Sequence, residues 1–157
     1  VLDADALNAV ATDLDVLGRA KGPLVLTPHP GEMSRLTGVP TKDLQKARVE
    51  VARDFASTHE VTLVLKGART LIAHPDGTVY VNPTGNPGMA TGGMGDVLSG
   101  LLGALLAQGL KLPEAAWTAV YAHGLSADLM VARRGQLGLI ATDVAKGLCN
   151  VWTRWNR

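Results

Sequence analysis

Short apolar runs alternate with longer amphipathic segments along the chain. The runs Pro23–His29 and Val61–Gly67 are closed by proline or glycine, which predicts two buried strands. Between them, Thr41–His59 has apolar residues at helical spacing, which predicts one amphipathic helix capped by Thr41. The apolar residues that define its face are Leu44, Ala47, Val51 and Phe55.

The remaining pattern adds a hairpin and several helices. Thr70–His74 and Thr78–Asn82 flank the turn Pro75-Asp76-Gly77, which is typical of a β-hairpin. Val1–Leu2 is predicted to be the end of a strand. Alternating strands and helices predict an α/β fold with a mostly parallel sheet, forming a single domain over residues 1–157. The further helices are expected near Leu7–Ala11, over Gly31–Gly38, from Gly95 to Gln108, from Pro113 to Arg134, and from Asp143 to Trp155 with Thr142 as the cap.

Composition narrows the function classes. The 157 residues suit one domain, and aromatics make up only 4%, so the core is expected to be aliphatic. A net charge of +1 gives no electrostatic case for a nucleic-acid or membrane partner. We expect a cytoplasmic protein, since no apolar run is long enough to span a membrane. The lone Cys149 is interpreted as a small core residue.

The segment Asn82–Gly109 begins as a glycine-rich loop and ends as an apolar helix. Glycines before a helix allow backbone amides to approach an anion, and the helix N-terminus favours negative charge. Gly92, Gly93 and Gly95 fit that use. Asp96 follows in the first turn, either as an ordinary first-turn acid or as a general base beside a bound phosphate. The loop has neither the ending of a P-loop nor a dinucleotide fingerprint.

Polar residues also follow the predicted strands. Lys66 ends one strand, where ligands gather in α/β sheets, although a solvated lysine is the simpler alternative. His29 lies between two prolines, which fix its backbone direction, and Glu32 is either a site residue or a first-turn acid. Asp3, Asp5 and Asn8 form either a turn with a helix cap or part of a site. The other histidines, His59, His74 and His123, have no ligand spacing and are interpreted as surface or hydrogen-bonded residues.

Four stretches in order resemble one family. The segment "NPGMATGGMGDVLSG" (86–100) resembles the anion-hole motif of the ribokinase-like superfamily, and more narrowly the ADP/ATP-dependent NAD(P)H-hydrate dehydratases that repair nicotinamide nucleotides. The family usually has threonine where Met94 stands. The stretches "LDADALN" (2–8), "LTPHPGEMSRL" (26–36) and "LKGART" (65–70) are similar to further motifs of the same family. The resemblance implies a ribokinase-like three-layer α/β/α fold, of which this chain would be the C-terminal portion.

The resemblance also implies roles for named residues. Asp96 would be the catalytic base and would also contact the substrate, hydrated NADH or NADPH. ADP or ATP would be the co-substrate, with Mg²⁺ bridging its phosphates, and no protein metal ligands are expected. The nucleotide would be bound by Lys66, Gly67, Ala68, Arg69, Thr70, Gly92, Gly93 and Gly95. The hydrated nucleotide would be bound by His29, Gly31, Glu32, Arg35 and Asn86.

Other functions stay open at this point. Another ribokinase-like kinase, of the hydroxyethylthiazole or sugar type, would share the anion hole, and a non-catalytic nucleotide-binding fragment would bind without turnover. The family resemblance suggests a homo-oligomer, and Trp152 and Trp155 are expected to serve in packing or subunit contacts. A chain of only this length would expose a sheet edge, so we expect it to be inactive alone or to need a partner.

Overall fold

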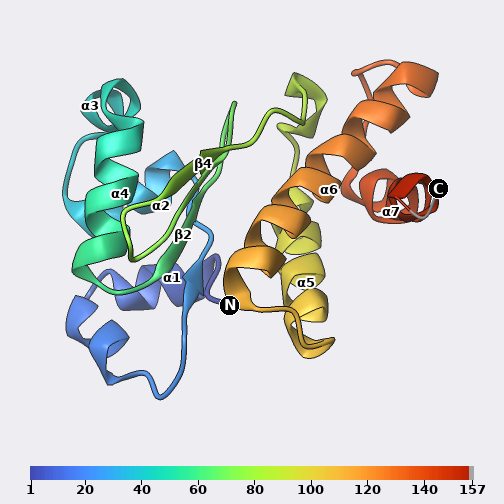
Figure 1. Cartoon of the computed structure of the whole chain (residues 1–157). Helices are drawn as coiled ribbons and strands as arrows, with labels where there is room; N and C mark the ends of the chain where they lie inside the picture. Colours follow the sequence, from blue (N-terminus) through green and yellow to red (C-terminus); the bar gives the residue numbers. More distant parts are fainter. Residues whose placement is uncertain (156–157) are drawn as a thin grey trace. The chain divides into compact units, whose positions relative to one another are not determined.

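The computed structural model describes residues 1–155, except for the side chain of Arg134. It contains two compact units, Val1–Val81 and Asn82–Arg157, and each is described by itself. Figure 1 shows the first unit as a sheet with helices and the second as a group of helices. The prediction of a single domain over the whole chain stays a prediction.

The first unit contains a mixed four-stranded sheet in the order β1-β2-β3-β4. Strand β1 (Val25–Leu26) runs parallel to β2 (Thr62–Leu65), and a parallel bridge joins Leu2 to Leu26. Strands β3 (Leu71–Ala73) and β4 (Val79–Val81) form the expected hairpin and pair antiparallel. The predicted strands and hairpin are therefore confirmed. The sheet is mixed rather than mostly parallel among the named strands, because β1 and β2 pair parallel whereas β2–β3 and β3–β4 pair antiparallel.

Helices α1 (Asp5–Val10), α2 (Pro30–Thr37), α3 (Thr41–Lys46) and α4 (Arg48–Thr58) accompany this sheet, with a 3-10 turn η1 (Leu14–Arg19). Helix α4 packs against β2, β3 and β4. The buried side chains between them are almost all aliphatic, as the composition predicted, and Phe55 is the aromatic among them.

The prediction of one helix over Thr41–His59 is wrong. The helix is broken at Ala47, whose φ of −124° and ψ of 39° are not helical. The apolar spacing survives the break because Leu44 and Phe55 still face the same core. The N-cap is Pro40 rather than Thr41, and Thr41 is the first helical residue.

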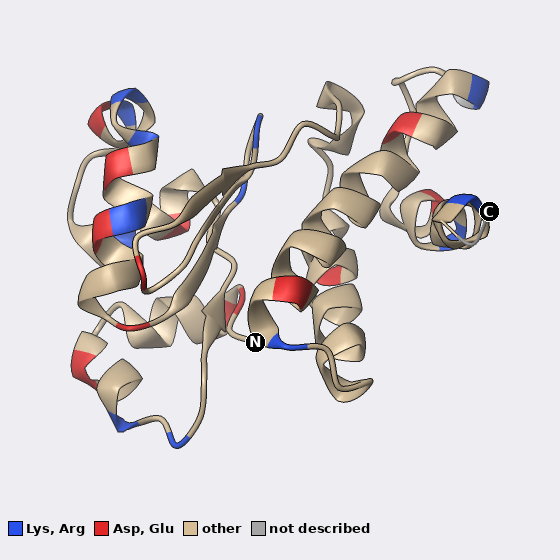
Figure 2. Ribbon diagram, in the orientation of Figure 1, with Lys and Arg blue, Asp and Glu red and all other residues tan. Residues whose placement is uncertain are grey.

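The second unit is helical. A 3-10 turn, η2 (Pro87–Met89), precedes α5 (Met94–Ala107), α6 (Leu112–Arg134) and α7 (Ala141–Trp155). Helix α6 contacts both α5 and α7, and its fully buried alanines allow the helices to approach closely. Figure 2 shows that charged residues are sparse on α5, where Asp96 is the single charged side chain.

Two predictions for α7 are wrong. Cys149 is exposed, because it lies on the side of α7 opposite to the buried Val144, Gly147 and Val151. The helix begins at Ala141, so Thr142 is already inside it, and the Asp143 carboxylate accepts from the Ile140 backbone N–H at 3.4 Å.

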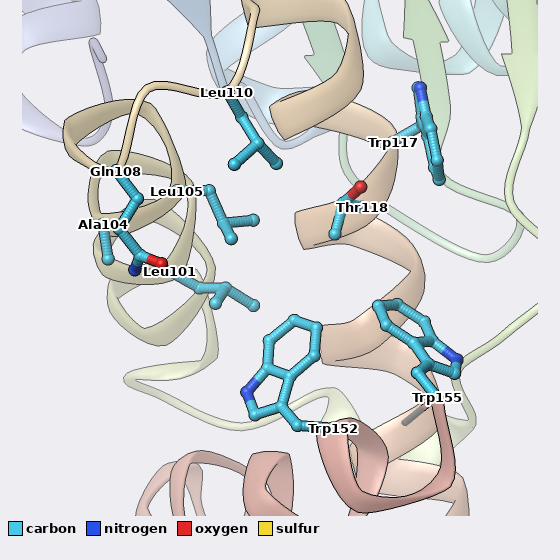
Figure 3. Close-up of a pocket in the computed structure, with 9 residues that line it drawn as sticks. All are labelled: Leu101, Ala104, Leu105, Gln108, Leu110, Trp117, Thr118, Trp152 and Trp155. Carbon is cyan, nitrogen blue, oxygen red and sulfur yellow. The ribbon is translucent and has the colours of Figure 1, made fainter. Parts of the chain in front are cut away.

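An apolar groove of about 820 Å³ lies among α5, α6 and α7. Its aromatic wall consists of Trp117, Trp152 and Trp155 (Figure 3). The Trp152 and Trp155 rings pack edge to face at 5.0 Å, and Trp155 stacks on Tyr121, which agrees with the packing alternative. The subunit-contact alternative stays a prediction. The groove follows the Leu101–Gln108 half of α5 and not its first turn. Within residues 1–155, no helix is long and apolar enough to cross a membrane.

Candidate active site

His29 and Glu32 build the start of α2 together. The His29 Nδ1 accepts from the backbone N–H of Gly31 at 3.0 Å and of Glu32 at 3.2 Å. The Glu32 carboxylate accepts in return from the His29 backbone N–H at 2.7 Å, which completes a capping box. Because Nδ1 is an acceptor, the proton of the neutral ring lies on Nε2, 3.3 Å from Glu32 Oε1. The first-turn role considered for Glu32 is therefore present in the structure.

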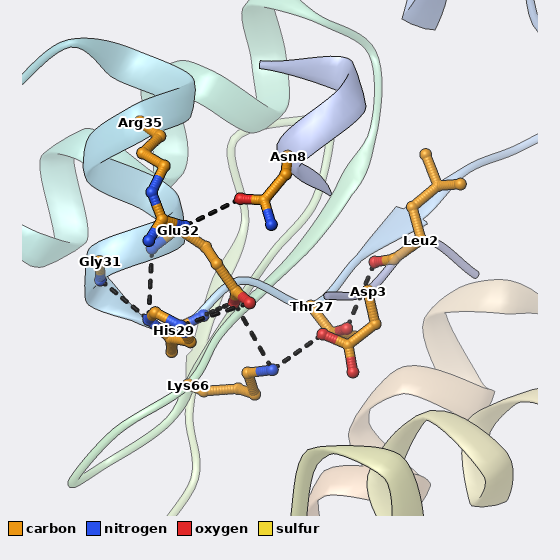
Figure 4. A network of polar contacts seen from close by, with 9 residues as sticks. All are labelled: Leu2, Asp3, Asn8, Thr27, His29, Gly31, Glu32, Arg35 and Lys66. Atoms are coloured by element: carbon orange, nitrogen blue, oxygen red, sulfur yellow. Dashed lines mark hydrogen bonds and ion pairs between the residues drawn. The ribbon is translucent and has the colours of Figure 1, made fainter. Parts of the chain in front are cut away.

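Lys66 is held between two carboxylates of the first unit. Its Nζ lies 2.8 Å from Asp3 Oδ1 and 3.7 Å from Glu32 Oε2 (Figure 4). All three side chains are largely withdrawn from solvent, with 20%, 13% and 8% of their areas exposed. The solvated alternative for Lys66 is therefore wrong. Of the two aspartates considered, Asp3 enters this cluster, whereas Asp5 is an exposed residue at the start of α1.

Arg35 and Asn8 lie at the edge of the same cluster. The Arg35 Nη1 donates to Asn8 Oδ1 at 2.9 Å, which ties α2 to α1. Figure 4 shows His29, Glu32, Lys66 and Asp3 joined by a continuous series of contacts. The structure thus brings together the residues of three stretches that are far apart in the sequence, 2–8, 26–36 and 65–70.

The segment Lys66–Thr70 forms a tight turn between β2 and β3. Gly67 has φ of 139° and Arg69 has φ of 56°, both in the range that L side chains rarely adopt. The Thr70 hydroxyl donates to the Gly67 carbonyl at 3.0 Å and closes the turn. Ala68 and Arg69 are exposed at its tip.

Arg48, at the start of α4, holds this turn through hydrogen bonds to its backbone carbonyls. It was not among the predicted site residues. Its Nη1 donates to the Ala68 carbonyl at 2.6 Å, and its Nη2 donates to the Leu65 carbonyl at 3.4 Å. Burial lowers the pKa of Arg48 from its usual value. In the sequence Arg48 is one basic residue among several on an amphipathic helix, so no local signal distinguished it.

The glycine loop of the second unit delivers its amides to the start of α5. Gly93 is the N-cap with φ of 84°, and no side chain caps the helix there. The amides of the first turn, which includes Gly95 and Asp96, are therefore available to an anion. Gly92 and Asp96 are exposed, so a ligand can reach both.

Asn86 lies earlier in the same loop and is held from two sides. Its Nδ2 donates to Asp128 Oδ1 on α6 at 2.8 Å, and its Oδ1 accepts from the Gly88 backbone N–H at 3.0 Å. Asp128 was not predicted as a site residue, because an isolated acid in a long helix carries no sequence signal of a loop partner.

Of the two alternatives considered for His74 and His123, the surface position is wrong and the hydrogen-bonded one is confirmed: His74 Nδ1 lies 3.1 Å from the Thr62 hydroxyl, and His123 has a hydrogen bond with the Met94 backbone. Both are buried, and the Nε2 of each has no hydrogen-bond partner among the described residues. Burial lowers the pKa of His123 to about 4, although a hydrogen bond with the Met94 backbone acts in the opposite direction. Burial likewise lowers the pKa of His74, and the nearby Asp76 charge partly opposes it. His59 packs its ring against Phe55 at 4.4 Å.

Comparison with known proteins identifies the family of this chain. The family model described as NAD(P)H-hydrate dehydratase matches residues 1–150. The chain belongs to the NAD(P)H-hydrate dehydratase family. The bifunctional NAD(P)H-hydrate repair enzyme Nnr of Moorella thermoacetica is 55% identical over 144 residues, which cover 92% of this chain and 27% of that protein.

Solved structures agree on the fold of this dehydratase family member. The ADP/ATP-dependent NAD(P)H-hydrate dehydratase of Bacillus subtilis, co-crystallised with ATP and Mg²⁺, is 43% identical with a TM-score of 0.83 over 85% of this chain and 48% of that chain. A ribokinase-like superfamily protein of Enterococcus faecalis is 30% identical with a TM-score of 0.80, over 98% of this chain and 52% of that one. The ribokinase-like fold class is therefore confirmed. The chain spans about half of each of these structures.

Proposed function

We propose that the protein removes water from hydrated NADH or NADPH at the expense of ADP or ATP and so regenerates the reduced nucleotide. The observation that carries this proposal is the uncapped first turn of α5, where free amides and Asp96 occur together. The names of the relatives support the substrate and the co-substrate. The full activity belongs to longer relatives, so its assignment to this chain is a proposal.

In the proposed reaction Asp96 removes the proton from the hydroxyl on the nicotinamide ring. The hydroxyl oxygen then bonds to the terminal phosphorus of ADP or ATP, and the bond from that phosphorus to the bridging oxygen breaks. Phosphate is a better leaving group than water, so cleavage of the ring C–O bond and loss of a ring proton restore the double bond. The amides at the start of α5 stabilise the charge that grows on the transferring phosphate.

The remaining predicted residues receive proposed binding roles. Gly92, Gly93 and Gly95 would bind phosphate through their amides, and the turn of Lys66, Gly67, Ala68, Arg69 and Thr70 would bind the nucleotide. His29, Gly31, Glu32 and Arg35 would bind the hydrated substrate. Asn86 has both amide atoms engaged by the protein, so we assign its part in the substrate site to the shape of the loop. Lys66 already faces two carboxylates, so a phosphate would have to compete with them.

Magnesium is proposed to arrive with the nucleotide. Among the described residues, no group of three His, Cys, Asp or Glu side chains could hold a metal ion. Mg²⁺ usually keeps several water ligands and binds through substrate phosphates, so a dedicated protein site is not required. Its chemistry would be to neutralise phosphate charge.

The decisive experiment compares Asp96→Asn with Glu114→Gln in the full protein that carries this sequence. Both acids lie in the first turn of an exposed helix end, Asp96 on α5 and Glu114 on α6. We expect Asp96→Asn to abolish recovery of the reduced-nicotinamide absorbance from hydrated NADH and ADP, with ADP binding kept. Glu114→Gln should keep both.

Other outcomes point elsewhere. Equal turnover in the two variants would exclude Asp96 as the base. A stable phosphorylated alcohol would indicate a kinase instead, and ADP binding without any turnover in the unmodified protein would indicate a non-catalytic module. We also expect a cytoplasmic homo-oligomer that acts on small molecules rather than on nucleic acid or membranes. Light scattering tests the oligomeric state.

A further inference from the structure

The loop before α5 lies directly against α6. The Thr84 hydroxyl is 3.0 Å from the Tyr121 carbonyl and 3.1 Å from Asn82 Oδ1. At Gly124 the contact is so close that an added Cβ would lie 2.3 Å from Thr84 Oγ1 and 2.9 Å from the Gly85 nitrogen. Helix α6 therefore provides the surface on which the loop is shaped.

Asp128 completes this surface one helical turn after Gly124. Its Oδ2 accepts from the Gly85 backbone N–H at 2.9 Å, and its Oδ1 accepts from Asn86 Nδ2 at 2.8 Å. Residues four apart on a helix lie on the same face, so Gly124 and Asp128 meet the loop together. Asn86 links Asp128 to the η2 turn, because Asn86 Oδ1 accepts from the Gly88 N–H and caps that turn. Asp128 therefore also restrains the start of η2.

The carboxylate is committed to the loop. No cation pairs with Asp128 among the described residues, and its two oxygens accept from neighbouring loop residues. Hydrogen bonds to an ionised acceptor are about twice as strong as neutral ones. The loop needs such restraint, because Gly85 with φ of 101° and the glycines that follow it carry a large conformational entropy.

We propose that Asp128 is a positioning residue for the nucleotide-binding loop. By fixing Gly85 and Asn86 it would present the amides of Gly92, Gly93 and Gly95 in the geometry that binds phosphate, without touching the reactants itself. This role rests on the proposed nucleotide function of the loop. It differs from a merely structural role, because it predicts that ADP affinity follows the geometry of the Asp128–Asn86 pair even where the fold is intact.

An exchange of the two side chains tests this role. In Asp128→Asn, an NH₂ group replaces one of the two accepting carboxylate oxygens. This group then faces a donor of the loop, either the Gly85 N–H or Asn86 Nδ2, and one hydrogen bond is lost. In Asn86→Asp, two carboxylates face each other. In the double variant Asp128→Asn/Asn86→Asp, the new Asn donates to the new Asp, and all three hydrogen bonds can re-form with the same total charge.

The measurements are the ADP dissociation constant and the hydrogen exchange of the Gly85 and Gly88 amides, both independent of turnover. We expect each single variant to weaken ADP binding about tenfold, the loss of about one charge-assisted hydrogen bond, and to speed exchange of both amides. The double variant should return within about threefold of the unmodified protein. Glu114→Gln, which removes an acid from the exposed first turn of the same helix, should change neither quantity.

Each alternative outcome has a distinct meaning. ADP affinity unchanged in Asp128→Asn, or a folded double variant that remains as weak as the single variants, would overturn the positioning role. If Asp128→Asn does not fold, the double variant and Asn86→Ala still test the positioning role. Asn86→Ala removes the hydrogen bond between Asn86 and Asp128 by deleting the donor in the loop. If ADP affinity and amide exchange change together, as expected, in a protein that regenerates no NADH, that result would support the positioning role of Asp128 and reject the proposed reaction. An unmodified protein that does not bind ADP would overturn both.

Discussion

The two candidate binding regions of this protein are built from different materials. In the first unit, the carboxylates of Asp3 and Glu32 each lie within 4 Å of the Lys66 Nζ, whose positive charge partly neutralises theirs. In the second unit, the start of α5 presents backbone amides and one exposed carboxylate, Asp96. The first region holds its shape through attraction between ions. In the second region, no side chain caps the start of α5, and the loop before it is held by hydrogen bonds to Asp128 on α6.

This difference teaches where each region is vulnerable. A backbone site is sensitive to any change that moves the main chain, including changes on the helix behind it. A side-chain cluster is sensitive to loss of one member, because a partly buried charge then lacks its partner. The following predictions test this contrast, from the largest expected effect to the smallest.

Substitution of Gly124 by alanine should have the largest effect. The added methyl group would overlap both Thr84 and the Gly85 backbone, and backbone cannot move aside as a flexible side chain would. We expect a loss of about 3 kcal/mol or more in the free energy of unfolding, measured by urea denaturation. Gly100→Ala is the control, because its Cβ would meet nothing within 4 Å in the middle of α5, and it should stabilise by up to about 1 kcal/mol. Equal effects of the two substitutions would contradict the close contact between loop and α6.

Acid should weaken the second unit through His123. Burial lowers the pKa of His123 to about 4 in the folded protein, whereas the unburied side chain in the unfolded chain has a pKa of 6.5. Between these two pH values the unfolded chain therefore binds more protons than the folded protein. Stability is therefore full above about pH 6.5 and is lost as the pH falls toward 4, by about 2–3 kcal/mol. Denaturation of His123→Gln across this range should show a correspondingly flatter pH dependence. The pH dependence that remains in this variant should include a contribution from His74, whose pKa is also lowered by burial. An unchanged slope would exclude His123 as the source.

Removal of the Lys66 charge should have a smaller effect. Lys66→Met leaves Asp3 and Glu32 without a cation, and we expect a loss of about 1–2 kcal/mol in unfolding free energy, since the pair is withdrawn from solvent without being fully buried. Lys46→Met is a matched control, because Lys46 forms a similar 2.9 Å pair with Asp43 on an exposed surface. Its loss should be below about 0.5 kcal/mol. Similar losses in the two variants would show that burial does not distinguish these pairs.

The smallest effect is expected at the start of α2. His29→Ala removes the acceptor for the Gly31 and Glu32 amides and should cost about 1 kcal/mol in thermal or urea unfolding. His29→Asn supplies another good N-cap and should restore most of that loss. If asparagine were no better than alanine, the ring would stabilise the helix through its contact with Glu32 rather than through the cap.

The sequence by itself determined the strands, the hairpin and the approximate extents of most helices, because apolar spacing and turn residues act locally. It also determined which glycines precede α5 and that an acid follows them. It failed at Ala47, where the helical spacing of Leu44 and Phe55 continues across a break in the backbone. A periodic pattern records which side faces the core, and it does not record whether the hydrogen-bonded chain is continuous.

The tertiary structure alone decided which polar residues act together. Asp3 and Lys66 are 63 positions apart and meet because the parallel pairing of the first unit brings both chain segments to one place. Asp128 and Gly85 are 43 positions apart and meet because α6 lies along the loop. Long-range contacts of this kind depend on packing between elements, and no spacing of residues along the chain encodes them. The same reason explains the error at Cys149, since the exposed side of α7 was set by the helices that cover its other side.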